Sequence, residues 1–137
     1  MFWRTLTTMT AFASGENYSI ELEATHAKAK VWRRPDLDSS AGAADAQGMV
    51  KQLKLLAATL TTLVLDLREA PSVAGPKTVE TMEELFATCE KLRVKVAIVL
   101  SEDPLQLLQF RRLAETHAPQ FGMVSTNLEA VESSIRA

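Results

Sequence analysis

The stretch LVLDLREAPSVAGPKTVETMEELF, residues 63–86, decides how this chain folds. Residues 63–67 are almost wholly apolar, as in a β-strand that is covered on both faces. A loop rich in proline and glycine follows, and Pro76 then opens a segment with apolar residues at helical spacing up to about Leu92. A second apolar run, residues 94–100, ends the unit. The pattern predicts a parallel strand–helix–strand unit.

Two segments nearer the N-terminus alternate between apolar and polar residues. YSIELE (residues 18–23) and AKAKVW (residues 27–32) are separated only by a short connection. Such alternation is typical of half-buried strands, and the short connection favours an antiparallel hairpin. Apolar residues then recur at helical spacing from about residue 43 to residue 60, which predicts a helix before the strand at residue 63.

The segment after residue 100 continues the alternation of helix and strand. Asp103 and Pro104 suit the cap and first position of a helix that runs to about His117. QFGMVS (residues 120–125) predicts a weaker strand, and residues 126–137 predict a last helix. The residues of the helix after Pro104 that we expect to point inward are Leu105, Leu108 and Ala114.

The order of elements is therefore β-β-α-β-α-β-α-β-α. We predict an α/β fold with a single mixed five-stranded sheet, in which an N-terminal antiparallel hairpin is followed by parallel strands. One domain would span residues 18–137, and residues 1–17 would be an N-terminal leader.

Composition narrows the classes of function. The chain has 137 residues and a net charge of −2, and its basic residues are scattered, so we expect no nucleic-acid partner. Its one cysteine, Cys89, excludes an internal disulfide and favours a reducing compartment, which we expect to be the cytoplasm. No apolar run approaches the roughly 20 residues that a membrane-spanning helix needs, so we expect no transmembrane segment.

No residues form a recognisable catalytic pattern. Ser72 lies in a loop without a G-x-S-x-G motif, and the two candidate bases, His26 and His117, fall at a hairpin turn and at a helix end. Cys89 lies on the apolar stripe of its helix, where a thiol has little reactivity. There is no metal-ligand spacing and no glycine-rich phosphate motif. We predict no enzymatic activity, no cofactor and no metal.

The order of elements and the segment 63–100 resemble STAS domains, the sulphate transporter and anti-sigma-factor antagonist modules with the SpoIIAA-like fold. The resemblance covers residues 18–137 and implies a bacterial, cytoplasmic regulatory protein. In the family, a phosphorylatable serine follows an aspartate at the start of the helix. Alignment on Asp66 places these two positions at Ala74 and Gly75, so the Asp-Ser motif is missing. The chain is therefore similar to degenerate members of the family.

The leading hypothesis is a non-enzymatic regulatory module that binds a protein partner through the loop 69–78 and the helix 76–92. The candidate contact residues are Arg68, Glu69, Ser72, Lys77 and Thr78. The alternative is a carrier of a small apolar or anionic ligand, held between sheet and helices. That alternative predicts a pocket above roughly 300 Å³, lined by residues such as Trp32, Met82 or Phe110.

The leader carries large apolar residues at spacings of three to four positions, which could form a short amphipathic helix. These residues are Phe2, Trp3, Leu6, Met9 and Phe12. Such a helix gains stability by covering its own domain or a second copy of the chain, because isolated helices this short are marginal in water. We therefore expect a homodimer in which the leader contributes contacts.

Overall fold

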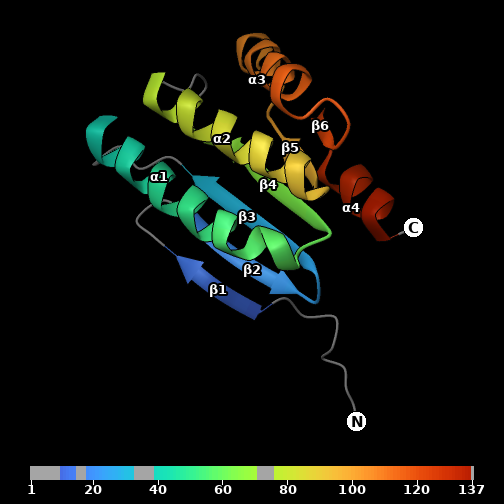
Figure 1. Cartoon of the computed structure of the whole chain (residues 1–137). Helices are drawn as coiled ribbons and strands as arrows, with labels where there is room; N and C mark the ends of the chain where they lie inside the picture. The colour runs from blue at the N-terminus through green and yellow to red at the C-terminus, as the bar shows by residue number, and fades with distance from the viewer. Residues whose placement is uncertain (1–9, 15–17, 33–38, 71–75, 137) are drawn as a thin grey trace.

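The computed structural model describes residues 10–14, 18–32, 39–70 and 76–136 (Figure 1). Three strands open the chain, and helices and strands then alternate to its end. In chain order, the elements are β1 (Thr10–Ser14), β2 (Tyr18–Glu23), β3 (His26–Trp32), α1 (Ser39–Leu56), the short 3₁₀-helix η1 (Ala57–Thr59), β4 (Thr62–Glu69), α2 (Pro76–Leu92), β5 (Lys95–Val99), α3 (Pro104–His117), β6 (Gly122–Ser125) and α4 (Leu128–Arg136).

All strands belong to one mixed sheet, in which they lie in the order of the sequence. Strands β1, β2 and β3 pair antiparallel, whereas β3, β4, β5 and β6 pair parallel. This confirms the predicted fold class, the hairpin and the order of elements from residue 18 onward. The sheet has six strands rather than the five that the sequence predicted, because part of the expected leader forms β1.

Strand β1 was not predicted from the sequence. It pairs with β2, and its register shifts between Ala11 and Ala13, so that Phe12 is the extra residue of a β-bulge. The predicted helical stripe is therefore wrong at Phe12, which lies in a strand. Residues 1–9 and 15–17, which hold the rest of the leader, are outside the described residues.

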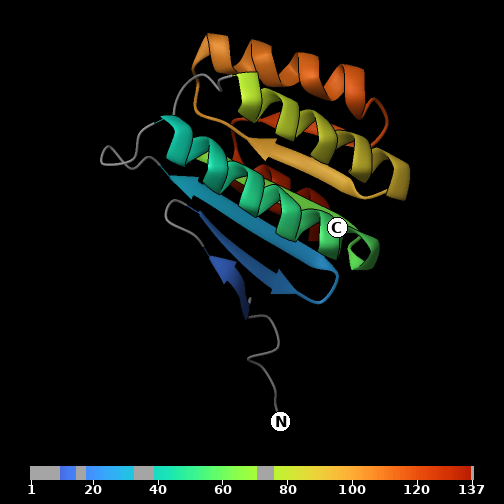
Figure 2. The ribbon, with the colours of Figure 1, turned by 60° about the vertical axis from the view of Figure 1, so that its left-hand side comes forward.

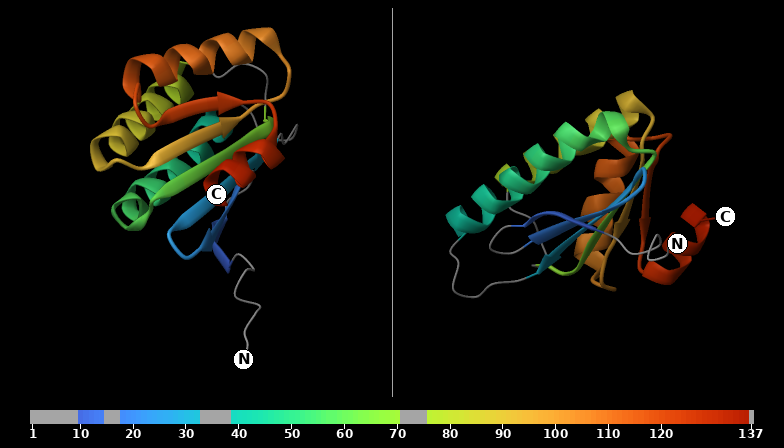
Figure 3. Two further views of the ribbon diagram at one scale, coloured as in Figure 1. Left: turned by 90° about the vertical axis from the view of Figure 1, so that its right-hand side faces the viewer. Right: turned by 90° about the horizontal axis from the view of Figure 1, so that it is seen from below.

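Three helices cover one face of the sheet and one covers the other. Helices α1, α2 and α3 lie side by side on the same face, as Figure 2 shows. This follows from the strand order, because right-handed crossovers that all advance in one direction place their helices on one side. Helix α4 lies on the opposite face (Figure 3).

The main core lies between the sheet and α1, α2 and α3. Leu65 on β4 and Ile98 on β5 are register partners at its centre, and both are 0% exposed. This confirms that both residues lie on central parallel strands. A second, smaller cluster lies under α4 and joins Val131 to apolar side chains of β4 and β5, which are Val64, Ala97 and Val99.

Helix α3 begins as predicted but buries a different stripe. Asp103 caps it by accepting hydrogen bonds from the backbone N–H groups of the second and third residues of the helix. Leu105 and Leu108 are 66% and 48% exposed, so their predicted inward orientation is wrong. Apolar residues occur on several sides of this helix, so their spacing alone did not predict which face packs on the sheet. The buried residues are Gln106, Phe110, Leu113 and Ala114.

Candidate functional site

The predicted contact residues lie where β4 leaves the core. Strand β4 is buried from Thr62 to Leu67, and its last two residues, Arg68 and Glu69, are exposed. Helix α2 follows after residues 71–75, which are outside the described residues. We name this surface the β4 rim, and it comprises Lys30, Asp66, Arg68 and Glu69.

Asp66 is the buried anchor of the β4 rim. It is 2% exposed, and its carboxylate accepts three hydrogen bonds from Arg68. Nε of Arg68 donates to Oδ1 at 2.9 Å, Nη2 donates to Oδ2 at 2.8 Å, and the backbone N–H donates to Oδ1 at 3.2 Å. Burial alone would raise the pKa of Asp66, but the hydrogen bonds and charge of Arg68 outweigh it, so this pKa lies below its ordinary value.

Glu69 is held by a second ion pair that reaches across to β3. Nζ of Lys30 lies 2.8 Å from Oε2 of Glu69. The hydrogen bond and the negative charge of Glu69 raise the pKa of Lys30, although burial opposes the shift. Arg68 and Glu69 keep 41% and 59% of their side chains exposed. Two opposite charges are thus positioned at the surface without being covered.

A third ion pair extends this charged surface toward α4. Lys28 on β3 lies 3.8 Å from Glu132 of α4. The charge of Glu132 also contributes to the raised pKa of Arg68, after the larger effect of the hydrogen bond to Asp66. In the strand register Lys28 lies opposite Glu21 of β2, but its ion pair is with Glu132 of α4.

The structure locates four of the five predicted site residues. Arg68 and Glu69 lie together at the end of β4, while Lys77 is exposed and Thr78 half-buried in the first turn of α2. Ser72 lies outside the described residues. Lys30 could not be predicted as a site residue, because its contact with Glu69 depends on the register between β3 and β4.

The other titratable candidates, two histidines and a cysteine, lie in surroundings that indicate structural roles. Nε2 of His117 lies 2.9 Å from Oε2 of Glu83 and so links α3 to α2. Cys89 is fully buried in the core, where burial raises the pKa of its thiol to about 12. His26 begins β3, and its Nδ1 is buried without a hydrogen-bond partner, as is Oε2 of Glu23.

Neither a metal centre nor a membrane span emerges from the described part of the chain. Among those residues, no three His, Cys, Asp or Glu side chains gather closely enough to hold a metal ion. None of the helices found there combines the length and the apolar character needed to cross a bilayer.

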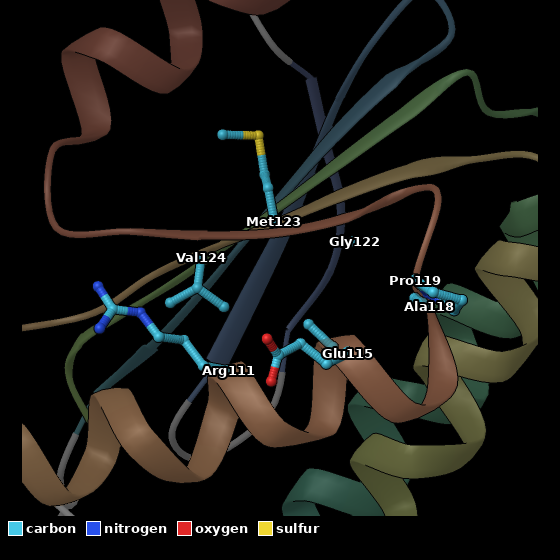
Figure 4. A pocket seen from close by; sticks show the side chains of 8 residues that line it. Arg111, Glu115, Ala118, Pro119, Gly122, Met123 and Val124 are labelled. Atoms are coloured by element: carbon cyan, nitrogen blue, oxygen red, sulfur yellow. The ribbon is translucent and has the colours of Figure 1, made fainter.

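A pocket lies between α3 and β6, at the edge of the sheet (Figure 4). Its volume is about 170 Å³, below the roughly 300 Å³ typical of small-molecule sites. Trp32, Met82 and Phe110 do not line it, and the last two are core residues. This pocket therefore gives no support to the ligand-carrier alternative. Its lining residues are Arg111, Ala114, Glu115, Ala118, Pro119, Gly122, Met123 and Val124.

Comparison with known proteins assigns no family to this arrangement. No protein-family model matches the sequence, and no curated protein matches it significantly.

Proposed function

We propose that this chain is a regulatory module of STAS-like type that acts by binding a protein partner at the β4 rim. The observation that supports the proposal is that Arg68 and Glu69 are held in place and yet remain exposed. Each is fixed by an ion pair to Asp66 or Lys30, yet each leaves a large part of its side chain exposed. Side chains that are already ordered lose less conformational entropy when a partner binds, so such a surface is preorganised for contact.

The position of the β4 rim in the fold gives further support. Ligands and partners of open α/β sheets commonly approach the carboxyl ends of parallel strands, and β4 ends there. Lys77 is exposed at the start of α2, and the proposed contact extends from the rim to the first turns of this helix. Glu80, about one turn further along α2, is also exposed and offers an additional polar contact.

We also propose that the protein works in a bacterial cytoplasm, in keeping with the resemblance to STAS domains. Cys89 is a free, buried thiol, which is compatible with a reducing compartment.

The test is capture of partners from the native host, identification by mass spectrometry, and titration of the purified partner against variants. Arg68→Glu and Glu69→Lys reverse the charges of the β4 rim. The matched control is Lys54→Glu, which breaks the exposed ion pair between α1 and α2 at Glu84. We expect the rim variants to weaken binding by about tenfold or more (about 1.4 kcal/mol) and the control to leave it unchanged.

Thermal unfolding of each variant separates a binding effect from loss of the fold. Equal binding by the two rim variants and by the Lys54→Glu control, with all of them folded, would refute the proposed function.

A further inference from the structure

Among the described residues, β6 ends the sheet and pairs only with β5. The carbonyl oxygens of Phe121 and Ser125 accept hydrogen bonds, both at 2.9 Å, from the N–H groups of Val96 in β5 and of Leu100 just after it. Backbone groups alternate along a strand, so those of Gly122 and Val124 point away from β5. The N–H of Gly122 already donates to the carbonyl of Ala118 at 2.9 Å. The carbonyl of Gly122 and both backbone groups of Val124 are therefore directed at the free edge.

This edge is not protected by the usual devices. Exposed edge strands are commonly blunted by charged residues, proline or a bulge. The four residues of β6 include no charge and no proline, and its register with β5 is regular. At the opposite margin, β1 has the bulge at Phe12. Met123, in the middle of β6, is 39% exposed.

The pocket of about 170 Å³ lies beside this edge. The pocket and the edge together form a groove, which we name the edge groove. Figure 4 shows the side chain of Val124 directed toward α3 and that of Met123 directed away from it. Ala118, in the turn after α3, packs directly against Gly122, and a Cβ at Gly122 would lie only 2.7 Å from the carbonyl oxygen of Ala118.

Two opposite charges flank the edge groove. Arg111 and Glu115 both line it from α3 and both are exposed. Within the described part of the chain, no ion pair engages either side chain. They are one helical turn apart, which corresponds to about 6 Å along the helix axis. Alternate residues of a β-strand are about 6.6–6.8 Å apart and point to the same face, so two such residues would match this spacing.

We propose that the edge groove binds an extended segment of a partner protein, which adds a strand to the sheet against β6. The segment carries one acidic and one basic side chain at alternate positions, the acidic one facing Arg111 and the basic one facing Glu115. The backbone groups of Gly122 and Val124 supply the hydrogen bonds of this added strand. The β4 rim plays no part in the proposal, which therefore stands or falls independently of the proposed function.

A second copy of the domain fits this edge poorly. Figure 3 shows, in its left view, that α3 extends past β6 at the margin of the sheet. Pairing β6 with β6 of a second copy would bring both α3 helices above two strands that lie about 4.8 Å apart. Packed helices need about 8–10 Å between their axes. The occupant is therefore a segment that has no helix above it.

The test uses four fluorescein-labelled peptides and the full-length protein, with binding measured by fluorescence anisotropy. TVEVKVT and TVKVEVT carry the mixed charges in the two possible directions along β6, while TVEVEVT and TVKVKVT are the matched controls. We expect one mixed peptide to bind best and both same-charge peptides to bind about threefold or more weakly, as expected when an exposed ion pair is replaced by repulsion.

Two variants make the test specific. Val124→Pro removes the outward N–H, a change that an edge strand tolerates, and we expect it to abolish binding while thermal unfolding shows a folded protein. Exchanging the charges, Arg111→Glu with Glu115→Arg, should reverse which mixed peptide binds better.

Three outcomes would overturn the proposal. They are the failure of every peptide to bind, binding that neither variant changes, and a dimer in light scattering that Val124→Pro dissolves, which would assign the edge to a second copy.

Discussion

The guanidinium of Arg68 forms a two-pronged contact with the carboxylate of Asp66, although only one residue separates them on β4. Alternate residues of a strand point to the same face, which allows Arg68 to fold back on Asp66. The contact neutralises a carboxylate that is 2% exposed, while the arginine stays partly in solvent. A buried charge is thereby satisfied from within its own strand.

Arg68→Ala should lower the free energy of unfolding at neutral pH. It leaves the Asp66 carboxylate buried without its main partner, which costs about 1–3 kcal/mol. Urea unfolding at pH 7 measures the loss. Arg112→Ala, at an exposed arginine of α3, is the matched control and should stay within about 0.5 kcal/mol of the unchanged protein. Equal stability of the two variants would show that the contact is energetically unimportant.

Because of the same contact, the loss of unfolding free energy in Arg68→Ala should depend on pH. Because the pKa of Asp66 is lower in the folded protein than in the unfolded chain, the stabilisation is complete above the unfolded pKa of about 3.9 and is lost as pH falls through the folded pKa. The gap in unfolding free energy between the unchanged protein and Arg68→Ala should therefore narrow below about pH 4. A gap that stays constant from pH 7 to pH 3 would contradict this assignment.

Leu65→Ala or Ile98→Ala should each destabilise the fold by about 2–5 kcal/mol, because each leaves a cavity at the centre of the sheet. Denaturant unfolding measures the change. Leu55→Ala supplies the control, since Leu55 is 71% exposed and its truncation removes little buried surface. Losses below 1 kcal/mol at both core positions would be incompatible with the packing described above.

The resemblance to STAS domains places the family's aspartate and serine positions at Ala74 and Gly75, so we expect no stoichiometric phosphate on this loop or on the first turn of α2. Intact-mass and phosphopeptide analysis of protein from its native host checks this. Stoichiometric phosphate on Ser72 or Thr78 would show that a displaced serine or threonine has taken over the switch.

The leader should contribute to a homodimer. Burying two or three of its large apolar side chains contributes roughly 3–9 kcal/mol before ordering costs. Light scattering on the full-length protein and on a form that starts at Thr10 measures the effect. The truncation must keep β1, since a start at Gly15 would remove a strand of the sheet. Monomers in both cases at about tens of micromolar would exclude the dimer.

Most of the fold could be predicted from local sequence patterns. The alternation in β2 and β3 and the apolar runs of β4 and β5 each depend on neighbouring residues, and their pairing follows from short connections and right-handed crossovers. Strand β1 was not predicted, because its sequence TAFAS lacks the alternation of apolar and polar residues and is interrupted by a bulge at Phe12.

The site was less predictable, because its contacts join distant parts of the chain. Lys30 meets Glu69 only through the register of β3 on β4, and this register itself shifts after Lys30. The burial of Asp66 and its contact with Arg68 could not be predicted, because they depend on how the side chains fold back. Leu108 was assigned to the core although the position of α3 at the margin of the sheet leaves it partly exposed.

The strict agreement between strand order and sequence order has a consequence for synthesis on the ribosome. Each strand pairs only with the strands just before and just after it in the chain, so no strand waits for a distant partner that has yet to be translated. The β1–β3 meander can form first, and each later helix and strand can dock on a surface that is already present as the chain emerges at about 5–20 residues per second. Until α4 has emerged, Val64, Ala97 and Val99 stay uncovered, so the nascent chain is most vulnerable to aggregation on this face just before α4 is made.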